Sequence, residues 1–282
     1  MTTVAIPGHF EVGPGRPFLF IGGPCVLESQ ALAEEVAGTL AEVADRLGIS
    51  YVFKASFDKA NRTSLDSYRG PGLVQGLKTL AAIREKFGVA VTSDVHEVAQ
   101  VAPAAEVLDL LQIPAFLCRQ TDLLVAAAQS GKPVSLKKGQ FVSPWDMQHA
   151  VGKIRAAGGG KRLMLIERGA TFGYNNLVVD MRSFPVLRAM GCPVIFDATH
   201  SVQLPGGAGG SSAGQREFIP TLARAAVAAG IDGIFMEVHP HPAKALCDGP
   251  NSMPLDQVEA LLRQLLAIHR TVSPFLNTDA QP

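Results

Sequence analysis

The sequence predicts a single closed (β/α)8 barrel. Short apolar or β-branched runs recur at residues 18–25, 51–57, 89–96, 110–114, 134–139, 163–169, 194–200 and 233–239. These runs are continuously apolar, which is typical of parallel strands that are buried on both faces. Helical patterns separate them, and a length of 282 residues suits one barrel of this kind.

The first helix is expected over residues 29–47. An apolar stripe runs from Leu32 to Leu47, Ser29 is placed to cap the helix, and Gly48 is placed to end it. The other helices are expected over residues 72–87, 97–105, 121–130, 144–157, 180–190, 216–229 and 256–269. An open doubly wound sheet is the alternative, but the glycine fingerprint expected after its first strand is missing from the sequence.

Two segments lie outside this alternation, although the whole chain, residues 1–282, is expected to form one domain. Residues 1–17 form an N-terminal extension, in which 4–6 and 10–12 predict a hairpin that plugs the N-terminal mouth of the barrel. The glycine-rich residues 203–215 are either a flexible surface connection or a lid over the carboxyl ends of the strands.

Composition argues against several classes of function. Lys and Arg total 25 against 25 Asp and Glu, and no basic run occurs, so neither nucleic acid nor an anionic membrane surface is an expected partner. The longest apolar stretches, such as residues 123–128, are far shorter than the roughly 20 residues that span a bilayer. Four cysteines and the lack of a signal-peptide pattern in residues 1–14 predict a cytoplasmic protein with free or metal-bound thiols.

Polar residues end nearly every predicted strand. Active sites of such barrels lie at the carboxyl ends of the strands. In chain order the last polar residues of the eight runs are Cys25, Lys54, Asp94, Gln112, Lys137, Arg168, His200 and Glu237. A barrel with a purely structural role would not need charge at so many strand ends, so we expect an active site here.

Part of this ring predicts a metal site. Closure sets the eighth strand beside the first, so Cys25, His200 and Glu237 share one arc. A thiolate, an imidazole and a carboxylate suit a divalent transition metal, and Asp248 is a fourth candidate ligand. The alternative is a buried thiol beside a hydrogen-bonded His–Glu pair. Two further histidines rival His200 as ligands: His239 and His241.

Cations from the second, fifth and sixth strands predict an anionic substrate. They are expected to face the metal arc, and they are Lys54, Lys59, Lys137 and Arg168. Cations inside apolar strands need an anionic partner, for which phosphate and carboxylate are the usual groups. Just after the second strand lie further donors, either for a second phosphate or in a solvated loop: Asn61, Arg62, Thr63 and Ser64.

These residues carry a family resemblance. The run KASFDKANRTS at residues 54–64 resembles the K-A-N-R-S signature of the 3-deoxy-D-manno-octulosonate 8-phosphate synthases, with Thr63 in place of the usual serine. Further matching segments are Gly-Pro-Cys25 and residues 113–122, 137–141, 167–176, 196–203 and 235–240. The resemblance covers residues 18–269 and rests on long, specific motifs.

The resemblance implies a reaction and an assembly. The family condenses phosphoenolpyruvate with arabinose 5-phosphate and releases phosphate, toward the inner-core sugar of Gram-negative lipopolysaccharide. Its members are (β/α)8 barrels and usually homotetramers. Cys25 resembles the metal-dependent branch, which implies His200, Glu237 and Asp248 as the other ligands of a divalent ion (Mn, Fe, Zn, Co or Cd). Residues 247–251, however, resemble the metal-independent branch.

The resemblance also implies a role for each site residue. Lys59, Lys137 and Arg168 would hold the phosphate and carboxylate of phosphoenolpyruvate. Asn61, Arg62 and Thr63 would hold arabinose 5-phosphate, the last two at its phosphate. The expected substrate-binding set is completed by Lys54, Asp94, Gln112 and Gln203, and by Arg119, which either reaches a neighbouring subunit's site or is a surface arginine. Lys59 is the candidate proton donor to the aldehyde oxygen, and His200 or Asp248 is a candidate to act on water.

Three other functions stay open at this point. The sister reaction of 3-deoxy-D-arabino-heptulosonate 7-phosphate synthase uses erythrose 4-phosphate, and that family tends to carry K-P-R-T-S where residues 59–64 read KANRTS. Asn61 therefore favours the longer sugar. A Schiff-base aldolase would use Lys137 as its nucleophile. A non-catalytic barrel that binds sugar phosphates is the third alternative.

Overall fold

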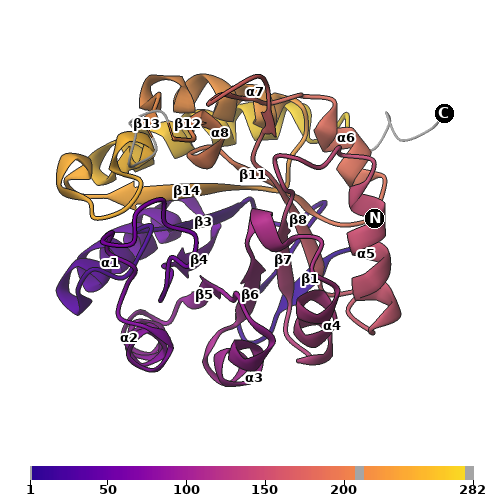
Figure 1. Cartoon of the computed structure of the whole chain (residues 1–282). Coiled ribbons are helices and arrows are strands. Elements are labelled where there is room, and N and C mark those ends of the chain that lie inside the picture. Colours follow the sequence, from indigo (N-terminus) through magenta and orange to yellow (C-terminus); the bar gives the residue numbers. More distant parts are fainter. Residues whose placement is uncertain (1, 207–212, 277–282) are drawn as a thin grey trace.

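Parallel strands close into a barrel in this computed structural model, which describes residues 2–206 and 213–276 (Figure 1). The eight strands of the barrel are β3 (Leu19–Gly23), β4 (Ser50–Lys54), β5 (Ala90–Asp94), β6 (Leu110–Ile113), β7 (Val134–Lys137), β8 (Leu163–Glu167), β11 (Val194–Asp197) and β14 (Gly233–His239). β14 pairs with both β11 and β3, which closes the ring. The predicted (β/α)8 barrel and the predicted contact between its first and last strands are confirmed.

Helices surround the strands (Figure 1). They are α1 (Gln30–Leu47), α2 (Leu73–Phe87), α3 (Val98–Val107), α4 (Thr121–Gln129), α5 (Met147–Ala156), α6 (Ser183–Arg188), α7 (Ile219–Ala228) and α8 (Val258–Val272). The predicted ends of the first helix are confirmed. Ser29 Oγ accepts a hydrogen bond from Leu32 N, and Gly48 adopts the left-handed conformation that ends α1. α6 begins at Ser183 and not at Asp180 as predicted. Arg182 N donates to Asp180 Oδ1, which holds residues 180–182 in a turn before the helix.

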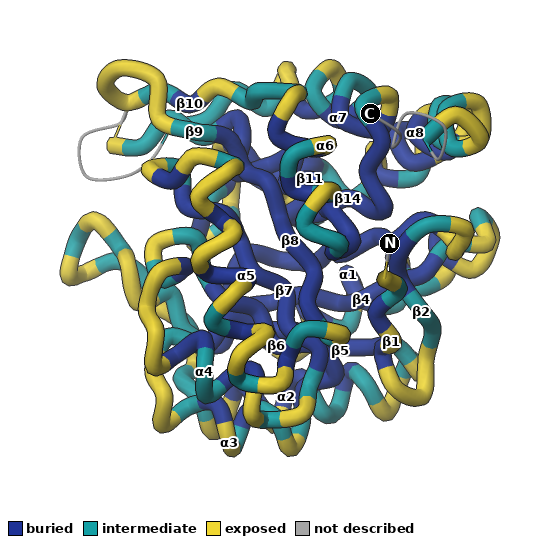
Figure 2. Tube along the Cα trace, turned by 90° about the vertical axis from the view of Figure 1, so that its right-hand side faces the viewer, coloured by how far each residue is buried: buried dark blue, intermediate teal, exposed yellow. Residues whose placement is uncertain are grey.

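The eight barrel strands are buried along their length, and most exposed residues lie on the helices and loops (Figure 2). A large apolar core lies between the strands and the helices. A second apolar cluster fills the N-terminal half of the barrel interior. The antiparallel hairpin of β1 (Val4–Ile6) and β2 (Phe10–Val12) joins this second cluster through Val4, Ile6 and Val12. The predicted N-terminal hairpin is therefore present and closes that end of the barrel.

Short elements follow the carboxyl ends of the strands. They are η1 (Ala115–Leu117), β9 (Ala170–Thr171), β10 (Leu177–Val178), η2 (His200–Val202), β12 (Gln203–Leu204), β13 (Ala213–Gly214), η3 (Arg216–Phe218), η4 (Pro242–Lys244), η5 (Gly249–Asn251), β15 (Met253–Pro254) and η6 (Leu255–Gln257). The ends of the predicted lid pair as β12 and β13, whereas its residues 207–212 lie outside the described residues. None of the helices in the described ranges has the length and hydrophobicity that crossing a bilayer requires.

Candidate active site

A cavity of about 660 Å³ opens at the carboxyl ends of the barrel strands. This volume falls in the range of small-molecule sites. It is lined by many of the residues that the sequence predicts for the site, namely Lys54, Lys59, Asn61, Arg62, Thr63, Asp94, Lys137, Arg168, His200, Gln203 and Asp248. Cys25, Glu237 and Gln112 contact these lining residues from below the surface of the cavity.

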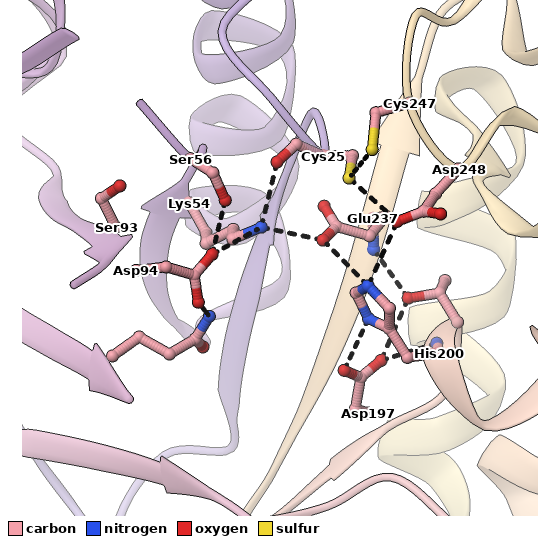
Figure 3. Close-up of polar contacts among 12 residues, drawn as sticks. Cys25, Lys54, Ser56, Ser93, Asp94, Asp197, His200, Glu237, Cys247 and Asp248 are labelled. Carbon is pink, nitrogen blue, oxygen red and sulfur yellow. Dashed lines mark hydrogen bonds and ion pairs between the residues drawn. The ribbon is translucent and has the colours of Figure 1, made fainter. Parts of the chain in front are cut away.

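The four predicted metal ligands lie close together (Figure 3). Cys25 follows β3, His200 begins η2, Glu237 lies in β14 and Asp248 precedes η5. Asp248 Oδ2 is 3.1 Å from Cys25 Sγ and 3.5 Å from His200 Nε2. His200 Nε2 is 3.6 Å from Glu237 Oε1. Four residues that are far apart in the sequence therefore direct sulfur, nitrogen and oxygen atoms toward one region.

The chemistry of these donors fits a divalent transition metal. In residues 2–206 and 213–276, buried Glu237 Oε2 has no hydrogen-bond partner, which leaves one carboxylate oxygen free for a cation. Ligand atoms of Cys25, Cys247 and Asp248 all lie within 4.8 Å of one another. Burial raises the pKa of the Cys25 thiol, and Cys247 and Asp248 add to this effect. Binding of a metal by Cys25 would therefore release its proton.

The rival histidines do not join this group. His239 Nε2 lies 3.5 Å from a Glu28 carboxylate oxygen, and His239 Nδ1 accepts a hydrogen bond from the backbone N of His241. The His241 side chain is exposed. Among the three candidate histidines, His200 is the one beside Glu237 and Asp248.

Asp197 orients His200. Its Oδ2 atom is 2.7 Å from His200 Nδ1 and 2.5 Å from Lys137 Nζ. This contact fixes Nδ1 as the proton-bearing nitrogen and directs Nε2 toward Glu237 and Asp248, a pattern common behind metal-binding histidines. Burial disfavours the Asp197 carboxylate, but the charges of His200 and Lys137 outweigh this and hold its pKa well below the usual range.

Lys54, which the sequence predicts to face the metal arc, contacts that arc directly. Its Nζ donates to Glu237 Oε1 at 2.8 Å and to the Cys25 carbonyl at 3.2 Å, and lies 3.8 Å from Asp94 Oδ2. Burial opposes the charge of Lys54, but Glu237, Asp94 and Cys25 together outweigh this effect and raise its pKa. Lys54 thus holds Glu237 and the backbone of Cys25 in position.

Asp94 is held on the other side of Lys54. Ser56 Oγ donates to Asp94 Oδ2 at 2.5 Å, and Gln112 Nε2 donates to Asp94 Oδ1 at 2.7 Å. Burial disfavours its carboxylate, but Lys54, with Lys59 and Lys137, holds its pKa well below the usual range. Gln112 thus contacts the cavity through Asp94.

Arg168 and Lys59 give the cavity its unbalanced positive charge. Arg168 is buried, and its Nη2 donates to Gln203 Oε1 at 3.0 Å. Its Nη1 has no hydrogen-bond partner within the described ranges. Burial opposes the charge of Lys59, but Cys25 and Cys247, followed by Glu237 and Asp94, raise its pKa. One buried and one half-buried cation with spare donors suit an anionic guest.

The loop after β4 supplies the outer part of the cavity. Asn61 and Thr63 are exposed there. Arg62 Nη1 is 2.7 Å from Cys247 Sγ, and its Nη2 donates to the Leu246 carbonyl at 3.2 Å. Arg119 is exposed and lines a separate hollow, so the structure does not bring it into the cavity of its own chain.

Known proteins resemble the chain over nearly its whole length. The profile of the DAHP synthetase I family matches residues 2–272. A protein of Desulfotalea psychrophila named 2-dehydro-3-deoxyphosphooctonate aldolase is 70% identical over 93% of this chain and 93% of its own. Proteins with the same name from Geobacter sp. (strain M21) and Trichlorobacter lovleyi are 59% and 60% identical over 97% and 96% of this chain and 100% of their own. The chain belongs to the DAHP synthetase I family.

The names of the relatives distinguish the octulosonate reaction from the heptulosonate reaction, the first of the alternatives above. The description of the family refers to the heptulosonate reaction, whereas these relatives carry the name of the octulosonate enzyme. The resemblance that residues 54–64 indicated is therefore confirmed.

Two residues of this family member escaped the sequence prediction. The seventh strand was expected to run to His200, but β11 ends at Asp197, and His200 lies in η2. The alternation of a strand would have found Asp197, because Ile195 and Asp197 share a face. Cys247 was missed because it was taken only as part of the segment next to Asp248.

Proposed function

We propose that the chain condenses phosphoenolpyruvate with D-arabinose 5-phosphate and water to give 3-deoxy-D-manno-octulosonate 8-phosphate and phosphate. The observation that carries the proposal is one cavity that holds both an inner set of cations and an outer set of polar groups that includes Arg62. The names of relatives at 58–70% identity support the same reaction. Asn61 and the motif around it favour arabinose 5-phosphate over erythrose 4-phosphate.

The inner cations suit phosphoenolpyruvate. Lys137 and Arg168 are buried at the ends of neighbouring strands, and Lys59 lines the same cavity. We assign the phosphate and carboxylate of phosphoenolpyruvate to these three residues, because Arg168 retains an unpaired donor and Lys59 a full charge. Asn61, Arg62 and Thr63, in the outer loop, are assigned to arabinose 5-phosphate. Lys54, Asp94, Gln112 and Gln203 complete the proposed substrate-binding set, and Gln203 contacts Arg168 directly.

The reaction forms one carbon–carbon bond and one carbon–oxygen bond to water, and it breaks the carbon–oxygen bond to phosphate. The methylene carbon of phosphoenolpyruvate attacks the sugar aldehyde, and the clamped anions hold these atoms in line. The aldehyde oxygen gains negative charge and takes a proton, for which Lys59 is the assigned donor. Water adds to the carbon that carries the phosphate, and phosphate then leaves. We assign the role of assisting this water to His200 or Asp248.

Cys25, His200, Glu237 and Asp248 are the proposed ligands of a divalent metal. When bound there, the ion would supply a Lewis acid for the aldehyde oxygen. The mixed sulfur, nitrogen and oxygen donors suit Mn, Fe, Zn, Co or Cd. The fit rests on the free Glu237 oxygen and on the orientation that Asp197 gives to His200.

We further propose a cytoplasmic homotetramer that acts in lipopolysaccharide biosynthesis. Near the cavity the loops expose large apolar side chains, which suit contact with another copy of the chain. These are Phe116, Phe141, Trp145, Phe172 and Tyr174. Arg119 lies beside η1 but outside its own cavity, so a neighbouring subunit's site is the assigned target of its side chain. Sedimentation velocity would test the assembly.

Phosphate release tests the reaction and the metal together. We expect release from phosphoenolpyruvate with arabinose 5-phosphate, loss of release after treatment with a chelator, and recovery when a divalent ion is added back. Release that survives chelation would keep the reaction but remove the metal role. Absence of release in metal-replete protein, with turnover of erythrose 4-phosphate instead, would assign the sister reaction.

Variants of two buried cysteines sharpen this test. Cys25→Ala removes a proposed ligand, so we expect loss of bound metal and of metal-dependent release with the fold retained. Cys192→Ala is the matched control, because Cys192 is also buried but lies in the turn before β11. Full metal-free activity of Cys25→Ala would contradict the metal role.

A further inference from the structure

Two cysteine sulfurs face each other at the edge of the cavity. Cys25 Sγ and Cys247 Sγ are 3.0 Å apart, although the residues are separated by 222 positions in the sequence. Both side chains are buried, and Figure 3 shows the sulfurs pointing toward one another beside Asp248. The proposed reaction gives no role to Cys247.

Hydrogen bonds hold both sulfurs in this arrangement. The Cys25 carbonyl accepts from Lys54 Nζ at 3.2 Å and from Ser56 N at 3.3 Å, which fixes the backbone after β3. On the opposite side, Arg62 contacts Cys247 Sγ and the Leu246 carbonyl. The two thiols are therefore held as a pair by elements on both sides of the site.

We propose that Cys25 and Cys247 are a dithiol pair that a hydroperoxide converts to a disulfide when no metal is bound. A disulfide bond is about 2.05 Å long, so the sulfurs need to approach by only about 1 Å. The disulfide would occupy the Cys25 sulfur and so block metal binding at this site. That consequence rests on the metal site of the proposed function, whereas formation of the disulfide rests on the two sulfurs alone.

The order of steps follows from access. Cys247 lines the cavity, and Cys25 lies beneath it, so Cys247 meets the oxidant first. The Cys247 thiol takes one oxygen from the hydroperoxide and becomes a sulfenic acid, while the hydroperoxide is reduced and leaves as water or an alcohol. The Cys25 thiol then attacks the Cys247 sulfur, the S–S bond forms, and the sulfenic oxygen leaves as water. Both sulfurs are oxidised by one equivalent of hydroperoxide.

Mass spectrometry of the full chain tests the pair. Metal-free protein is treated with hydrogen peroxide, and its thiols, intact mass and peptide links are measured. We expect two of the four thiols to be lost, the mass to fall by about 2 Da, and one peptide link to join Cys25 to Cys247. Zinc binding, measured by calorimetry, should be lost on oxidation and recovered on reduction. Protein loaded with zinc before the peroxide should keep all four thiols.

Two variants separate this pair from the other buried cysteines. Cys247→Ser should form no link, whereas Cys192→Ser, the matched control, should form the same link as the wild type. Oxygen added to Cys247 without loss of the Cys25 thiol, or a link through Cys118, would overturn the proposal. A link in protein that never binds zinc would support the pair and refute the metal site. If the protein binds zinc and releases phosphate but peroxide forms no link, the proposed cysteine pair is refuted and the proposed function is retained.

Discussion

The two halves of the barrel interior differ sharply, although the same strands build both. On one strand after another, an apolar inward residue is followed two positions later by a polar one: Val52 by Lys54, Leu110 by Gln112, Ile166 by Arg168, Ile195 by Asp197 and Phe235 by Glu237. The apolar residues and the hairpin form the floor of the barrel, and the polar residues form its mouth. A step of two residues moves only about 7 Å along a strand.

This difference separates stability from function within one fold. The floor buries side chains that have no polar atoms, and burial of this kind stabilises the fold. The mouth buries cations and carboxylates, and burying charge is unfavourable unless each charge is paired. Replacing a floor residue should therefore lower stability, whereas replacing an unpaired cation of the mouth should lower activity. Three substitutions test this, in order of decreasing effect.

Arg168→Met should have the largest effect. Among the described contacts of Arg168 there is a hydrogen bond to Gln203 but no ion pair, and burial lowers the pKa of this guanidinium. We expect kcat/KM for phosphate release to fall roughly 10³-fold, or about 4 kcal/mol, because the substrate anion loses a buried cation. The free energy of unfolding should stay the same or rise by about 1 kcal/mol, since a buried charge is removed. Steady-state kinetics and urea unfolding measure the two effects.

Arg224→Met is the control for Arg168→Met. Arg224 also contacts a glutamine, Gln264, but does so on the outer helices α7 and α8. Kinetics like those of the wild type are expected. If Arg168→Met kept kcat/KM within about tenfold of the wild type, the assignment of the inner cations to phosphoenolpyruvate would be wrong.

Ile21→Ala should reverse this pattern. Ile21 is fully buried in the floor on β3, between Phe235 of β14 and Val52 of β4. Removing most of its side chain should lower the free energy of unfolding by about 3 kcal/mol, and Ile21→Val should lower it by about 1 kcal/mol. Activity per folded molecule should be retained in both variants. Loss of activity without loss of stability would mean that floor and mouth do not act separately.

The sequence predicts this division well at the level of strands. Apolar runs that end in a polar residue predicted all eight strands and eight members of the mouth or of the metal arc, from Cys25 to Glu237. This works because a buried parallel strand must be apolar until it reaches the cavity. Closure of the barrel sets the last strand beside the first, so strand order also predicted that Cys25, His200 and Glu237 lie close together.

What the sequence did not predict depends on side chains and loops. His200 was assigned to the end of the seventh strand, but β11 ends at Asp197 and His200 lies in η2. Both side chains therefore reach the mouth, where they contact each other. The contact between Lys54 and Glu237 on β14 was not predicted, because it depends on the reach of a long side chain. Cys247 meets Cys25 because a loop after β14 folds back over the cavity. Loop paths and side-chain reach are not encoded in strand periodicity.

Asp94→Asn should have the smallest effect, and one that depends on pH. The pKa of Asp94 in the folded chain lies well below its unfolded value of about 3.9, because Lys54, Lys59 and Lys137 together outweigh its burial. Its contribution to stability is thus fully present above about pH 4 and is lost as the pH falls toward the folded pKa. We expect Asp94→Asn to lower the free energy of unfolding by about 2 kcal/mol at neutral pH, and the difference from the wild type to narrow below about pH 4.

Urea unfolding across this pH range measures the narrowing. Asp45→Asn, at an exposed carboxylate on α1, is the control, and a surface substitution of this kind should change the free energy little at any pH. A difference between Asp94→Asn and the wild type that stayed constant into acid would mean that Asp94 stabilises the mouth through its hydrogen bonds with Ser56 and Gln112. A difference in the free energy of unfolding that narrows in acid would mean that the charge of Asp94 stabilises the neighbouring lysines. The stability of the mouth would then depend on ionisation, whereas that of the floor does not.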